Sequence, residues 1–73
     1  MVVRAKMYVT CVKKWHKGSE EIEFACVTSG SEENKIFAKY TPQGNLRLVI
    51  EKESLFGHFQ PGDVFYVDLT KTE

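Results

Sequence analysis

The sequence predicts an all-β fold: a small five-stranded antiparallel barrel, SH3-like or OB-like, with one helical turn before the last strand. Two observations predict it. Apolar and polar residues alternate along several short segments, and turns rich in glycine, proline and small polar residues separate those segments. The chain has 73 residues, which is enough for a single domain spanning 1–73 and too few for a second. Closure into a barrel is favoured over an open sheet because it leaves no unpaired edge strand.

The first two strands are predicted from alternation with a period of two residues. Residues 2–15 form one long strand whose odd positions, from 3 to 11, face the core and whose other face is basic. Residues 17–19 form a turn, and residues 20–28 return as the hairpin partner. The core-facing residues of this second strand are Ile22, Phe24 and Cys26.

The second half of the chain supplies the rest of the barrel. Residues 28–34 are polar and small, which predicts a loop. Residues 53–59 break the alternation, and we expect them to form one helical turn held by packing of its apolar side chains. The remaining strands are predicted at 35–40, 45–51 and 64–70. Pro61-Gly62 predicts a type II turn before the last strand. A helical turn between strands four and five favours an SH3-like barrel, since the OB helix follows strand three, but both topologies stay open.

Neither a metal site nor a cofactor site is predicted. Cys11 and Cys26 lie in apolar segments without a second Cys or His at metal-ligand spacing, so we expect free buried thiols. A disulfide between them stays possible if the first two strands pair. Charges at Arg4 and Lys6 interrupt the start of the chain, so we expect no export signal, and the apolar runs are too short to cross a membrane.

The chain contains no recognisable catalytic pattern. His16 and His58 have no nucleophile or carboxylate in a suitable local context, so surface or packing roles are expected. The acidic neighbours 20–21, 32–33 and 51/53 are expected to be solvated, because adjacent strand residues point to opposite faces. The glycines are isolated in turns and form no phosphate loop. We therefore expect a protein that is not an enzyme.

The charge distribution is uneven although the net charge is zero. Residues 1–18 hold five Lys and Arg and no acid, so residues 19–73 carry a net charge of −5. Aromatic rings between cations are typical of single-stranded nucleic-acid binding, because bases stack on rings while cations contact phosphates. The candidate residues for such a site are Arg4, Lys6, Tyr8, Lys13, Lys14, Trp15 and Lys17. A basic strand neutralised by acidic neighbours or by a second subunit is the alternative interpretation.

Three motifs lie in the last two thirds of the chain: Glu-Asn-Lys at 33–35, Thr-Pro-x-Gly at 41–44, and Phe-x-Pro-Gly-x-x-x-Tyr-x-Asp-x-Thr at 59–70. In these motifs the chain resembles a group of small uncharacterised proteins encoded by tailed bacteriophages. The resemblance implies a viral origin, with localisation in the host cytoplasm or in the virion. It transfers no activity and no site residues.

Two functional hypotheses follow. The first is a non-enzymatic phage accessory or structural protein that acts through protein–protein contacts, as a homo-oligomer or with another viral or host protein. Outward residues expected to provide contact area are Tyr8, Val12, Phe37 and Val49. The second hypothesis is a module that binds single-stranded DNA or RNA through the basic first strand. Virion component, host-defence antagonist and a small-molecule pocket between subunits also stay open.

Overall fold

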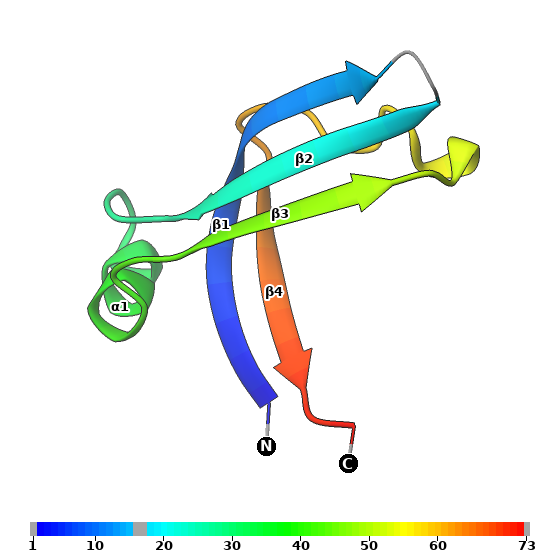
Figure 1. Cartoon of the computed structure of the whole chain (residues 1–73). Coiled ribbons are helices and arrows are strands. Elements are labelled where there is room, and N and C mark those ends of the chain that lie inside the picture. The colour runs from blue at the N-terminus through cyan, green and yellow to red at the C-terminus, as the bar shows by residue number, and fades with distance from the viewer. Residues whose placement is uncertain (1, 16–17, 73) are drawn as a thin grey trace.

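In the part of the chain that the structure describes, four strands, one α-helix and one short 3-10 helix make up the fold (Figure 1). The computed structural model describes residues 2–15 and 18–72. In chain order the elements are β1 (Val2–Trp15), β2 (Ser19–Cys26), α1 (Glu32–Tyr40), β3 (Asn45–Ile50), η1 (Glu53–Leu55) and β4 (Val64–Thr70). The structure therefore confirms a mostly β fold, with strands close to four of the five predicted segments and a helical turn before the last strand.

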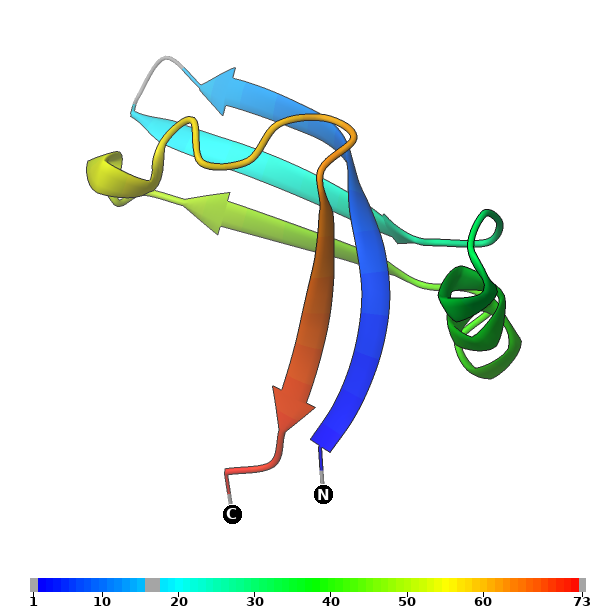
Figure 2. The same cartoon turned by 180° about the vertical axis from the view of Figure 1, so that it is seen from behind.

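The four strands form one antiparallel sheet in the order β3-β2-β1-β4. The long β1 joins its two parts, because β2 pairs with residues 7–15 of β1 and β4 pairs with residues 2–8. The sheet curls about β1 into a half-barrel, so that β4 and the first half of β1 turn away from β2 and β3 (Figures 1 and 2). We call β4 together with residues 2–8 the wing.

A β-bulge in β1 changes which side chains face the core. The pairing passes from Val9 opposite Phe24 to Cys11 opposite Glu23, so Thr10 is the extra residue. Beyond the bulge, the odd-numbered residues of β1 lie on the outer face of the sheet and the even-numbered residues lie on the core face. Cys11 therefore lies on the face of Glu23, and Val12 lies on the face of Ile22. The predictions that Cys11 faces the core and that Val12 faces outward were both wrong.

The core lies on the concave side of the bend, which we call the inner face. It is formed by Met7, Val9, Ile22, Phe24 and Cys26. Side chains from β3, β4 and the connection before β4 pack around it, and Phe24 makes edge-to-face contacts with Phe59 and Phe65. The predicted inward positions of β2 are confirmed. Both cysteines are free, and they lie on opposite faces of the sheet.

Residues 35–40 form most of helix α1, so the third predicted strand was wrong, and so was a loop extending through residue 34. Ser31 caps the helix by accepting a hydrogen bond from the Asn34 amide, and two glutamates occupy the first turn, where negative charge is favoured by the helix dipole. The helix packs on the opposite, outer face of the wing, where Phe37 contacts Tyr66 with ring centroids 5.9 Å apart. The segment thus has a helical and not a strand period.

Losing that strand leaves too few strands to close a barrel. The described sheet has four, and its edges are β3 and β4, which do not pair with each other. The five-stranded closed barrel is therefore not confirmed. The turn at residues 60–63 agrees with the prediction: Gly62 has φ +93°, and the Asp63 amide donates to the Gln60 carbonyl over 3.0 Å.

Candidate functional site

The inner side of the wing is an exposed apolar surface. Cross-strand partners on it are Met7 with Phe65, Ala5 with Val67, and Val3 with Leu69. Exposure increases along the wing away from the core: Met7 is 5% exposed, whereas Val3 is 56% and Leu69 is 65% exposed. We call Val3, Ala5, Val67 and Leu69 the inner wing face. It continues the hydrophobic core outward, and no described element covers its far end.

Strand β3 carries further apolar side chains on the same side of the sheet. Leu46 and Ile50 pack partly against the core, and Leu48, opposite Ile22 in the register, is 40% exposed. The two edge strands of the half-barrel, β3 and β4, therefore both present apolar side chains on its concave side. In a closed barrel these side chains would be buried against each other.

Charged side chains of the wing lie on its outer face and are paired within the chain. Arg4 forms a bidentate ion pair with Asp68, with nitrogen–oxygen distances of 2.7 and 3.0 Å. Lys6 donates to Glu33 of α1 over 2.8 Å, and the Tyr66 hydroxyl donates to the same carboxylate. These contacts fasten the helix to the sheet and leave the inner wing face without charge.

The outer-face contacts shift the pKa values of their partners. Hydrogen bonds from Lys6 and then from Tyr66 hold the pKa of Glu33 below its usual value, and the same bond to Glu33 raises the pKa of Tyr66. The hydrogen bond from Arg4 lowers the pKa of Asp68. All of these shifts favour the ionisation states that the pairs require at neutral pH.

The structure distributes the predicted nucleic-acid candidates over both faces. Arg4, Lys6, Tyr8, Lys13 and Trp15 lie on the outer face, whereas the bulge puts Lys14 on the inner side, opposite Glu20. Lys17 and His16 lie outside the described residues. Arg4 and Lys6 are engaged in ion pairs, and the Lys6 side chain is only 15% exposed. Trp15, at 48% exposure, and Lys13 remain accessible on one face.

Two glutamates whose sequence context predicts exposure to solvent are buried. Glu20 is 1% and Glu21 is 4% exposed. Glu21 accepts from Arg47 over 2.9 Å, which lowers its pKa, whereas Glu20 accepts a 3.3 Å hydrogen bond from the Gly57 amide. Strand parity could have placed Glu20 inside, because it shares a face with Ile22. Glu20 fixes the connection between β3 and β4 to β2.

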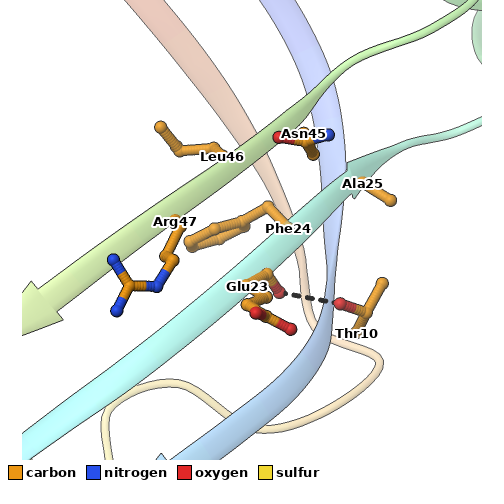
Figure 3. A pocket seen from close by; sticks show the side chains of 7 residues that line it. All are labelled: Thr10, Glu23, Phe24, Ala25, Asn45, Leu46 and Arg47. Carbon is orange, nitrogen blue, oxygen red and sulfur yellow. Dashed lines mark hydrogen bonds between the residues drawn. The ribbon is translucent and has the colours of Figure 1, made fainter.

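Hollows on the described part of the chain bring few titratable side chains together. One hollow, of about 390 Å³, is lined by Thr10 and by residues of strands β2 and β3 (Figure 3). Its titratable side chains are Glu23 and Arg47, and Arg47 already donates a hydrogen bond to Glu21.

His58 lies outside this hollow and packs edge-to-face on Phe59, with ring centroids 5.0 Å apart. Across residues 2–15 and 18–72, no cluster of three metal-ligating side chains occurs.

Comparison with known protein families, curated proteins and solved structures finds no match to this chain. Among the described helices, none has the length and apolar character needed to cross a membrane. The function is therefore inferred from the geometry of the chain itself. Its most distinctive element is the uncovered inner wing face.

Proposed function

We propose that this chain is a non-enzymatic protein-contact module that binds through the inner wing face. The observation that carries the proposal is the exposure of Val3 and Leu69, which face each other across β1 and β4 at 56% and 65%. Contiguous apolar surface of this kind costs free energy in water and typically marks a protein interface. The partner would complete the hydrophobic core that the half-barrel begins.

The surrounding chemistry supports protein contact over catalysis. The inner wing face consists of aliphatic side chains, which can exclude water but cannot transfer protons or attack a substrate. Strand β4, at one edge of the sheet, offers unpaired backbone groups next to that surface, and a partner can hydrogen-bond to such an edge. In keeping with the phage resemblance, the proposal extends to an accessory or structural role in a bacteriophage, as a homo-oligomer or with another viral or host protein.

Photocrosslinking tests the proposal. A benzophenone amino acid replaces Leu69 in one sample and Ile36, on the outer side of α1, in another; these residues are 65% and 56% exposed. The crosslinking is done in an extract of cells that express the chain. We expect position 69 to crosslink to protein, including other copies of the chain, and position 36 to crosslink far less. The absence of protein adducts at position 69 would refute the proposal.

Single-stranded nucleic-acid binding is the second candidate function, and the exposed Trp15 beside Lys13 favours it. A base stacked on Trp15 would quench its fluorescence, and binding would weaken with salt as phosphate counterions return. The Trp15→Ala substitution is expected to cost about 1–3 kcal/mol of binding if one base stacks there. A labelled mixed-sequence oligonucleotide titrated at two salt concentrations tests this, and unchanged Trp15 fluorescence at low salt would reject it.

A further inference from the structure

We infer that the partner on the inner wing face is a second copy of this chain, in a two-fold dimer that places the two wings against each other. This inference rests on the proposed function, since it names the occupant of the same surface. A two-fold interface is self-complementary, so residues of one copy meet the same patch on the other. Val3 and Leu69 of each copy would lie at its centre.

The accessible surface of the chain supports a partner of this size. A folded monomer of 8.4 kDa is expected to expose about 4,600 Å². This chain exposes 5651 Å². The excess is about 1,000 Å², and a standard protein interface buries about 800 Å² on each partner. One interface of ordinary size would therefore remove the excess.

The shape of the molecule leads to the same conclusion. Its radius of gyration is 13.6 Å, whereas a compact chain of this length is expected near 11 Å. The principal extents of 39, 34 and 18 Å describe a flat, open structure. Its half-barrel has one concave apolar side, and a second half-barrel facing it would form a two-layered core of the usual kind.

Charge favours a second copy over a charged partner. The net charge is zero, so two copies approach without long-range repulsion. The inner wing face carries no charged side chain, and Arg4, Lys6 and Asp68 lie on the outer face in pairs within the chain. An acidic or basic partner would find no counter-charge there, whereas an identical apolar face is complementary.

The edge strands are compatible with such an approach. Neither β3 nor β4 contains proline or lysine, the residues that commonly protect edges against pairing. The charged residues in them, Arg47 and Asp68, are already bonded to Glu21 and Arg4. The edges are therefore free of the usual barriers to contact with another copy.

Sedimentation velocity of the purified full chain over a wide concentration range tests the inference. We expect a dimer for the wild type and for Ile36→Asp, a control of similar exposure on the outer side. Leu69→Asp should raise the dimer dissociation constant by about a hundredfold or more, because each copy brings an unpaired carboxylate into the interface. Leu69→Ser is the milder variant, and we expect it to raise the dimer dissociation constant by a smaller factor. Circular dichroism verifies that every variant is folded.

A wild type that remains monomeric at all concentrations would overturn the inference, and so would an oligomer as stable in folded Leu69→Asp as in the wild type. The crosslinking experiment separates this failure from failure of the proposed function. A monomer that crosslinks from position 69 to a different protein rejects self-association and retains the contact function. A monomer without any protein adduct at that position rejects both.

Discussion

Phe24→Ala should remove the side chain that holds the two parts of the half-barrel together. Phe24 is 3% exposed, and its ring lies 5.8 Å from that of Phe59 and 6.0 Å from that of Phe65, both edge-to-face. Truncation of a buried phenylalanine costs about 3–5 kcal/mol. At about 0.05–0.15 kcal/mol per residue, 73 residues give a total stability of roughly 4–11 kcal/mol. The variant should therefore lose from about a quarter of its stability to all of it.

Chemical denaturation followed by circular dichroism measures this loss, with all samples at one protein concentration because dimer stability depends on it. Phe37→Ala is the matched control, since Phe37 is a half-buried aromatic residue that packs on Tyr66 at the outer face. We expect the control to cost about 1–2 kcal/mol. If Phe24→Ala is no more destabilising than Phe37→Ala, the assignment of the core to the inner face is refuted.

Three further predictions concern the hydrogen bond between Glu20 and Gly57, the carboxylates of Glu33 and Asp68, and the turn at Gly62. Glu20→Leu should accelerate hydrogen exchange of the Gly57 amide, because its acceptor is lost, whereas Glu20→Gln should retain most of the protection. The pKa values of Glu33 and Asp68 are lower in the folded chain than in the unfolded chain, where they are about 4. The two carboxylates therefore stabilise the fold fully above that pH, and the stabilisation is lost as the pH falls through their folded-state pKa values. The midpoint of chemical denaturation should stay constant from pH 6 to 8 and decrease below about pH 4. Gly62→Ala should cost about 1–2 kcal/mol in the same assay, because Gly62 has φ +93°; an unchanged midpoint would contradict the turn geometry.

The strands were predictable because their sequence periods are local. Alternation along residues 2–9 and 22–26 gave both the strands and their buried faces, and Pro61-Gly62 indicated the turn before β4. The bulge at Thr10 was not predictable, because a single extra residue is defined by pairing with β2. That one residue reverses the faces of everything from Cys11 to Trp15.

Helix α1 was missed because its residues were interpreted with the wrong period. Ile36, Phe37 and Tyr40 have helical spacing, and Ser31 followed by two glutamates is a helix start signal present in the sequence. Assigning this segment to a strand supplied the fifth strand of a barrel. Without it the sheet stays open, and the openness is what exposes the inner wing face.

The candidate site depends on contacts between segments that are distant in the chain. The prediction of a basic outer face was correct for the positions of Arg4 and Lys6. Their neutralisation arises from Asp68 and Glu33, which are 64 and 27 residues away in the sequence. Exposure of Leu69 likewise follows from the absence of a covering strand, so local alternation alone could not reveal it.

Isotope-filtered nuclear Overhauser spectroscopy on a mixture of labelled and unlabelled chains tests whether two copies meet at the inner wing face. It detects contacts between copies at individual methyl groups. We expect intermolecular signals at the methyls of Val3 and Leu69, and none at Ile36. Intermolecular signals at Ile36 without any at Val3 and Leu69, or none at all at a concentration of about 1 mM, the range where even weak association is populated, would contradict this expectation.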